Sequence, residues 1–489
     1  MNLKNITKEL LVKYENLPIQ MRASVWFLIC GFLQRGISVI TTPIFTRIMT
    51  TAEYGQYNVF SSWMSIITCF VSLNLYGGVY AQGLVKFESR RPQFAAAFQG
   101  LLFTLTCAWT VVYLIFRQPL NELLSLTTFQ GILMLVLIWT SSVFQLWAQE
   151  ERANFRYKTL VWITLLFSVC TPALGILFIF LSEDSVTARI LGMALTSILL
   201  YSWMFAGQIK KGKTFFSKEI WVYALGLALP LIPHYLSQMI LSGFDRIMIS
   251  ELVGDAKAGI YSLAYAISSI MIIFNTSLMS TVEPWVYRKI KEKELDRIAQ
   301  IAYPCFVMIA LINLVLIIMA PEIIRIFAPA EYYEAIWVIP PLAMGVYFMF
   351  LYTFFAMFEF YYEKTKYIST ATLVGAVANV ILNYICIKLF GYIAAAYTTL
   401  FCYIIYVVMH YCFMRKVCRE YLNNAKVYEL KILLAITAGF MLLSFGMMFL
   451  YEHLVLRYGV LCVMLVIVVI KRKVIIEFVK AFLSEKKAP

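Results

Sequence analysis

The chain has 489 residues, of which 62% are hydrophobic and only 14% are charged, and its net charge at pH 7 is +14. Soluble domains have about 45–50% apolar and about 25% charged residues, so this composition excludes an ordinary soluble fold. The positive charge does not indicate nucleic-acid binding, because the Lys and Arg residues lie in short segments between apolar runs. The composition therefore predicts an integral membrane protein.

Apolar segments recur along the whole chain, and most approach the roughly 20 residues that a helix needs to cross the hydrocarbon core. We expect an all-α polytopic membrane protein with about 14 transmembrane helices. The first 20 residues are polar and contain lysine, so we expect no cleavable signal peptide. In chain order, the predicted helices cover residues 23–44, 57–80, 94–116, 130–148, 159–181, 188–208, 220–242, 258–283, 298–319, 334–359, 367–387, 391–413, 430–450 and 454–470.

The distribution of Lys and Arg gives the expected orientation, because these residues concentrate in cytoplasmic loops. With the N-terminus placed inside, the loop at Lys210–Lys218 is cytoplasmic and the loop at Ser182–Thr187 is external. Both termini are then cytoplasmic, as expected for a protein of a bacterial inner membrane. All loops are short, which leaves no room for a soluble catalytic domain. The external segments hold only Arg47, Arg117, Arg189, Arg246, Lys257, Arg325, Lys388 and Arg457.

An internal repeat suggests two related halves. Residues 45–49 (FTRIM) follow the first predicted helix, and residues 244–248 (FDRIM) follow the seventh. Six helices separate the two copies, so both copies run in the same direction through the membrane. The alternative is that this short match arose by chance. Parallel repeats are typical of transporters whose halves rock about a central site. We therefore expect two parallel-related six-helix lobes and two extra C-terminal helices with a basic tail, in residues 1–213, 214–426 and 427–489.

Several motifs resemble the polysaccharide transporter family, which includes Wzx-type O-antigen and capsule flippases. They are Thr42-Pro43-Ile44-Phe45-Thr46-Arg47, Leu229-Pro230-Leu231-Ile232-Pro233-His234, Asp245-Arg246, Ala258-Gly259-Ile260-Tyr261 and Ala320-Pro321-Glu322-Ile323-Ile324. The resemblance covers nearly the whole chain. It implies a two-lobed fold of the multidrug/oligosaccharidyl-lipid/polysaccharide exporter type, with a hydrated cavity. It further implies that a polyprenyl-diphosphate-linked oligosaccharide is carried from the inner to the outer leaflet.

Arg35 is a charged residue inside the first predicted helix, where an arginine costs roughly 2.5–3.5 kcal/mol to insert at the bilayer centre. Ser38 and Thr42 continue its face of the helix. A guanidinium can pair bidentately with phosphate oxygens, so Arg35, Ser38 and Thr42 are candidates for substrate contact. The alternatives for Arg35 are snorkelling to the outer interface or a structural ion pair. Arg47, in the following loop, is a candidate for gating.

The seventh predicted helix carries a matching polar stripe of candidate cavity residues, His234, Gln238 and Ser242, which leads to Asp245. Pro230 and Pro233 remove backbone hydrogen bonds, so we expect a structural interruption there. His234 suits either a structural or a proton-linked role. Asp245 and Arg246 suit either headgroup contact or gating and coupling.

Three further polar residues lie in predicted helices. Glu283 is a candidate for ion coupling, or it pairs with Arg288 at the interface. Asn379 and Asn383 are expected to form structural hydrogen bonds between helices. Nine of the ten cysteines lie in apolar segments and none forms a C-x-x-C motif, so we expect no disulfide, metal or cofactor.

The sequence therefore predicts a flippase rather than an enzyme, with membrane lipids around it, H⁺ or Na⁺ as a coupling ion and no nucleic acid. Glycosyltransferases and a polymerase are the expected neighbours in its pathway. One alternative is a drug/cation antiporter of the same superfamily, which should carry carboxylates in its first or seventh helix. The other is a membrane polysaccharide polymerase, which should have a large external loop.

Overall fold

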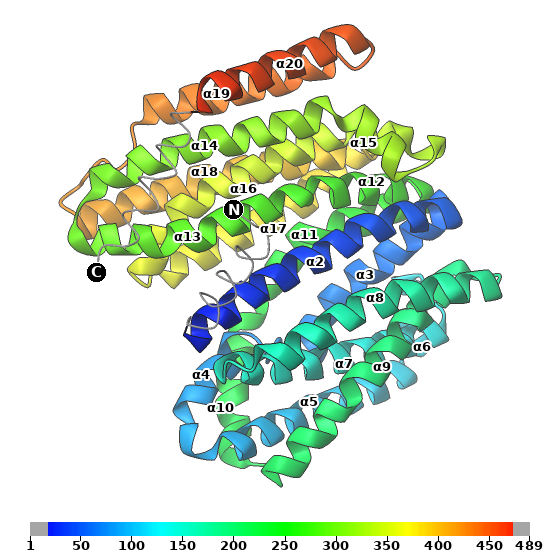
Figure 1. Ribbon diagram of the computed structural model, residues 1–489. Helices are drawn as coiled ribbons and strands as arrows, with labels where there is room; N and C mark the ends of the chain where they lie inside the picture. The colour runs from blue at the N-terminus through cyan, green and yellow to red at the C-terminus, as the bar shows by residue number, and fades with distance from the viewer. Residues whose placement is uncertain (1–17, 473–489) are drawn as a thin grey trace, which may run out of the picture. The chain divides into compact units, whose positions relative to one another are not determined.

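The computed structural model describes residues 18–472, and its regular elements are helices (Figure 1). The expected cytoplasmic termini, residues 1–17 and 473–489, lie outside the described residues. The chain divides into two compact units between Met239 and Ile240, within α11. This division lies later in the chain than the predicted lobe boundary at residues 213/214.

Unit 1 is organised around α9, which packs against α5, α7 and α8, while α2 packs against α8 (Figure 1). The last helix, α11, continues into unit 2. The elements, with 3-10 helices written η, are α2 (Ile19–Ile48), α3 (Thr51–Val71), α4 (Gly78–Lys86), η1 (Glu88–Arg90), α5 (Arg91–Ile115), α6 (Arg117–Leu124), α7 (Thr128–Ala153), α8 (Tyr157–Leu181), α9 (Ser185–Gly212), α10 (Lys218–Ala228), η2 (Leu229–Leu231) and α11 (Ile232–Leu252).

Unit 2 is organised around α16, which packs against α12, α13, α14 and α18, while α17 packs against α18. Most of α16 is buried, so it is the core helix of this unit. The remaining elements are α12 (Asp255–Ser268), α13 (Ile270–Glu292), α14 (Leu295–Ile318), α15 (Ala320–Phe327), η3 (Ala330–Trp337), α16 (Ile339–Tyr361), α17 (Thr365–Phe390), α18 (Ala394–Tyr421), α19 (Leu430–Met448) and α20 (Leu454–Ile470).

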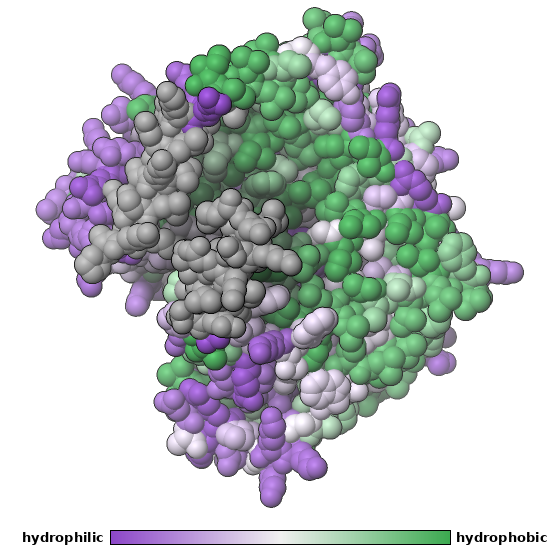
Figure 2. Space-filling model, viewed as in Figure 1, coloured by the Kyte–Doolittle hydropathy of each residue, from purple (hydrophilic) through white to green (hydrophobic). Residues whose placement is uncertain are grey.

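The all-α polytopic prediction is confirmed. Within residues 18–472, 12 helices are long and apolar enough to cross a membrane, and Leu454–Ile467 is a shorter apolar helix. Large apolar side chains such as Trp162 and Leu181, each 74% exposed, point outward, as lipid-facing surfaces require. Figure 2 shows broad apolar areas on the visible face, with hydrophilic side chains gathered toward the helix ends. The number of 14 spans stays a prediction, because α3 is not among the 12.

Three of the predicted helices have wrong bounds. The single helix predicted at 57–80 is two helices, α3 and α4, because Leu73 and Asn74 both adopt left-handed backbone conformations (φ 49°) that end α3. The first and seventh helices also continue past their predicted ends, so Arg47, Asp245 and Arg246 are helical rather than in loops. Backbone hydrogen bonding continues through these charged residues, whereas the prediction placed the helix ends where the apolar run stopped.

A second internal match appears where α7 meets α8 and where α16 meets α17. Phe155 and Glu363 occupy equivalent positions in the two turns, and both are left-handed (φ 54° and 55°). The next residue in each turn donates its N–H to a glutamate carbonyl at 2.8 Å, from Arg156 to Glu151 and from Lys364 to Glu359. This shared geometry agrees with a repeat between the halves. The residues matched at the same spacing are Ala148 with Ala356, Glu151 with Glu359, and Lys158 with Lys366.

Candidate functional site

A polar cavity of about 330 Å³ lies within unit 1, among α2, α3, α8 and α9. Two arginines, Arg35 and Arg189, line it, and no carboxylate does. The cavity therefore has the charge and the hydrogen-bonding groups to hold an anion. The other lining residues are Gln34, Ile37, Ser38, Thr41, Phe45, Tyr57, Phe167, Ser168, Thr171 and Pro172.

The structure places two of the three candidate residues of the first helix in this cavity. Arg35 and Ser38 line it, whereas Thr42 does not. The Thr42 hydroxyl donates to the carbonyl of Ser38 at 2.8 Å, and Thr41 lines the cavity instead. Arg47, farther along α2, donates from Nη1 to the carbonyl of Pro43 at 2.8 Å and is not a lining residue.

Arg189 is a cavity residue that the sequence analysis assigned only to an external segment. Its guanidinium lies 3.7 Å from the ring centre of Phe45 and 3.6 Å from that of Tyr57. Such cation–π contacts fix the orientation of a guanidinium while its N–H groups can still donate in the guanidinium plane. Three separate helices form this arrangement, so no local sequence pattern predicts it.

Unit 2 contains a buried polar network centred on Asp245, which is only 2% exposed. One carboxylate oxygen accepts from Asn383 at 2.5 Å, and the other accepts from Tyr261 at 2.7 Å and Thr399 at 2.8 Å. Asn383 also donates to Asn379 at 3.1 Å. The network joins α11, α12, α17 and α18, and it satisfies the buried carboxylate with three hydrogen-bond donors.

Both asparagines of α17 bond to other helices, since Asn383 donates to Asp245 of α11 and Asn379 donates to Thr399 of α18 at 3.4 Å. The Arg246 guanidinium lies over the Tyr265 ring, 4.2 Å from the ring centre. Of the α11 stripe, Gln238 and Ser242 are exposed, while Asp245 is enclosed by the helices of unit 2. The four predicted stripe residues therefore differ in environment, because neighbouring helices cover the later turns of α11 and leave the side chains of Gln238 and Ser242 exposed.

The predicted interruption by Pro230 and Pro233 is present, since the 3-10 turn η2 separates α10 from α11. His234 follows it, and its Nε2 lies 3.3 Å from Nε2 of Gln238, one helical turn away. Glu283 in α13 accepts from the Tyr287 hydroxyl at 2.8 Å. Within the described chain its ion pair with Arg288 is not formed.

A buried acid–base pair in unit 2 was not anticipated from the sequence. Glu359 of α16 and His410 of α18 are 0% and 2% exposed, with Oε1 2.8 Å from Nδ1. The imidazole ring stacks on Tyr352. In the sequence, Glu359 is visible as a charged residue near the end of an apolar segment. Its partner His410, however, lies 51 residues later in the chain, so the sequence does not show the pair.

Metal and disulfide chemistry find no support in the part of the chain that the structure covers. All ten cysteines are free, and residues 18–472 contain no group of three His, Cys, Asp or Glu side chains able to hold a metal.

Comparison with known proteins agrees with this arrangement. A protein of the Lsg locus of Haemophilus influenzae is 22% identical over 371 residues, which cover 73% of this chain and 88% of that protein. A structure of the lipid II flippase MurJ in an inward closed conformation superposes with a TM-score of 0.66 at 17% identity, covering 92% of this chain and 100% of MurJ. An inward-facing multidrug resistance MATE transporter gives a TM-score of 0.62 at 14% identity, covering 80% of this chain and 96% of that one.

Two family models match the sequence itself. The model described as MatE matches residues 230–385. The model described as polysaccharide biosynthesis protein matches residues 21–289, more than half of the chain. The chain belongs to the polysaccharide biosynthesis protein family, and it has the multi-pass helical fold seen in the MurJ and MATE structures.

Proposed function

We propose that this transporter is a flippase that moves a polyprenyl-diphosphate-linked oligosaccharide from the inner to the outer leaflet of the bacterial cytoplasmic membrane by alternating access. The observation that carries the proposal is the unit 1 cavity, in which Arg35 and Arg189 face a space without carboxylates. Two guanidinium groups match a diphosphate, and the Ser38 and Thr171 hydroxyls around them add neutral donors. The proposed role is in cell-surface polysaccharide biosynthesis, for O-antigen, capsule or exopolysaccharide.

The drug/cation antiporter is the alternative within the superfamily, and one observation favours it. Asp245 is a buried carboxylate on α11, in the segment matched by the MatE model. A cationic drug, however, needs an acceptor in the binding cavity, and α2 contains no acidic residue. We infer instead that Asp245 binds the coupling ion, H⁺ or Na⁺, while the arginine-lined cavity takes the anionic substrate.

Arg35 tests the substrate assignment. A charge-assisted hydrogen bond contributes about 1.5–3 kcal/mol, so Arg35→Gln should weaken binding of a diphosphate lipid on the order of 10- to 150-fold and reduce transport in reconstituted vesicles. Arg189→Gln should act in the same direction, and Arg35→Lys should retain part of the activity. Arg117→Gln serves as the matched control, because Arg117 is an exposed arginine of unit 1 outside the cavity. Normal abundance with normal diphosphate-lipid affinity in Arg35→Gln would refute the assignment.

The proposed orientation, with the Lys210–Lys218 loop in the cytoplasm, predicts a labelling pattern. In a cysteine-depleted background, a membrane-impermeant thiol reagent on intact cells should label Ser185→Cys and not Lys213→Cys. After the cells are permeabilised, both positions should react, which controls for accessibility. Labelling of residue 213 alone in intact cells contradicts the orientation.

A further inference from the structure

Two adjoining cavities lie in unit 1 where α2 and α8 begin. The first, of about 370 Å³, is lined by three cations, Arg22, Arg156 and Lys158. The second, of about 480 Å³, is lined mainly by apolar and aromatic side chains farther along α8. Tyr157 and Lys158 line both cavities, so the cationic space continues directly into the apolar one.

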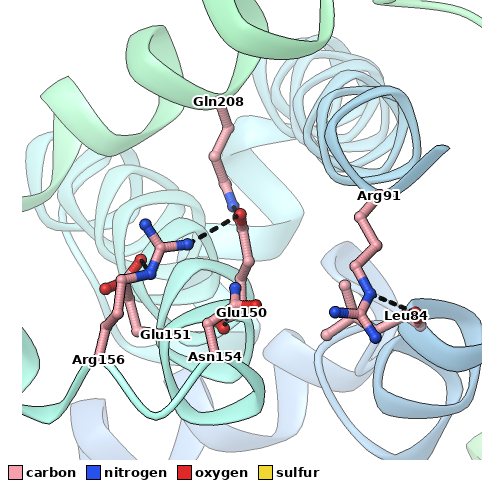
Figure 3. Close-up of polar contacts among 7 residues, drawn as sticks. All are labelled: Leu84, Arg91, Glu150, Glu151, Asn154, Arg156 and Gln208. Carbon is pink, nitrogen blue, oxygen red and sulfur yellow. Dashed lines mark hydrogen bonds and ion pairs between the residues drawn. The ribbon is translucent and has the colours of Figure 1, made fainter. Parts of the chain in front are cut away.

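The first cavity has a positive electrostatic character. No carboxylate is among its lining residues. Arg156 does have acidic neighbours, with Nε 3.6 Å from Oε1 of Glu151 and Nη2 4.0 Å from Oε1 of Glu150 (Figure 3). Arg22 and Lys158 are therefore the cations that remain for an anionic ligand, since neither forms an ion pair within residues 18–472. The positive ends of α2 and α8, which lack side-chain N-caps, add to the same potential.

The second cavity has the shape and surface of an acyl-chain groove. Its α8 side runs from Lys158 to Leu165, about 10 Å along the helix axis. Val161 is buried at its base, whereas Trp26 and Trp162 are exposed beside it. Indole side chains are enriched where a membrane protein meets the headgroup region. Because α2 and α8 are both candidate spans, this groove starts at the membrane boundary and extends toward the hydrocarbon.

We propose that these cavities together bind one anionic glycerophospholipid of the surrounding leaflet. Its phosphate lies in the cationic cavity against Arg22 and Lys158, and one acyl chain lies along the groove beside Trp26 and Trp162. Basic pockets between membrane helices are known headgroup sites. The bound lipid bridges α2 and α8, two helices that also line the transport cavity, so lipid composition sets how firmly they are held together. The site is separate from the diphosphate contact proposed for Arg35.

The test is a binding titration of the full-length protein in neutral detergent with phosphatidylglycerol, and with phosphatidylethanolamine as the zwitterionic comparison without net charge. Wild type should prefer phosphatidylglycerol. The double variant Arg22→Gln/Lys158→Gln should bind it roughly 30-fold more weakly, at about fivefold for each basic residue. The matched control is Lys210→Gln/Lys213→Gln, which removes two exposed cations of unit 1 that line neither cavity, and it should keep wild-type affinity.

A second variant tests the groove independently of charge. Leu165→Trp fills the apolar cavity, so it should weaken phosphatidylglycerol binding with every cation in place, and its melting temperature should show that it is folded. Equal losses in the two double variants, or equal affinity for the two lipids in wild type, would overturn the proposal. So would displacement of phosphatidylglycerol by a polyprenyl diphosphate at lower concentration, which would assign the site to the transported lipid. Arg35→Gln should bind phosphatidylglycerol normally, which separates this site from the transport site.

Discussion

Asp245→Asn should abolish net transport in reconstituted vesicles while substrate binding is retained. The carboxylate is the only formal charge in its network of Tyr261, Asn383 and Thr399, so the amide removes the group that takes up a proton or cation. The asparagine amide is nearly isosteric with the carboxylate. Its NH₂ group, however, replaces an oxygen that accepted a hydrogen bond, so it faces one of the donors of the network. Leaving a buried donor without a partner costs about 1–3 kcal/mol, so some loss of stability should accompany the loss of transport.

The measurement compares ion-gradient-driven transport, substrate affinity and thermal stability on the same preparation. Glu251→Gln is the matched control, since Glu251 is an exposed carboxylate on the same helix, outside the network. His234→Gln and Glu283→Gln test the other two candidates for coupling. Gradient-driven transport at the wild-type rate in Asp245→Asn would exclude this residue from coupling, whatever the stability of the variant.

Gly192→Ala should destabilise unit 1 by about 1–3 kcal/mol, the usual cost of adding a methylene to a packed interior. A Cβ at Gly192 on α9 would lie 2.6 Å from the backbone nitrogen and 2.8 Å from the Cα of Gly175 on α8. Backbone atoms cannot rotate away as a side chain does, so the two helices must separate. Small residues at such crossings let membrane helices approach closely.

This separation should also reduce transport, because Arg189 lies three residues before Gly192 on the same helix and its guanidinium lines the cavity. The comparison is thermal unfolding and transport of Gly192→Ala beside Gly207→Ala. Gly207 is also on α9, and no atom lies within 4 Å of its added Cβ. There the change to alanine should be neutral or stabilise by up to about 1 kcal/mol through helix propensity. Equal stability of the two variants would show that the α8–α9 contact tolerates a side chain.

The sequence by itself determined the class of this protein and much of its secondary structure. Apolar segments of membrane-spanning length are a local property, so the helical segments and the family resemblance could be predicted without any knowledge of packing. Local chemistry also predicted the interruption at Pro230 and Pro233, since a proline removes a backbone donor wherever it stands. It identified Arg35 as well, because a charge inside an apolar segment is visible in the sequence alone.

Only the tertiary structure decided which polar residues share a site. Arg189 belongs to a polar cavity because Phe45 of α2 and Tyr57 of α3 enclose its guanidinium. Asp245 is buried rather than exposed because α12, α17 and α18 cover that turn of α11. Periodicity gives the face of a helix on which a residue lies, but burial depends on which distant helix covers that face. Contacts between residues far apart in sequence arise from packing, and no local pattern records them.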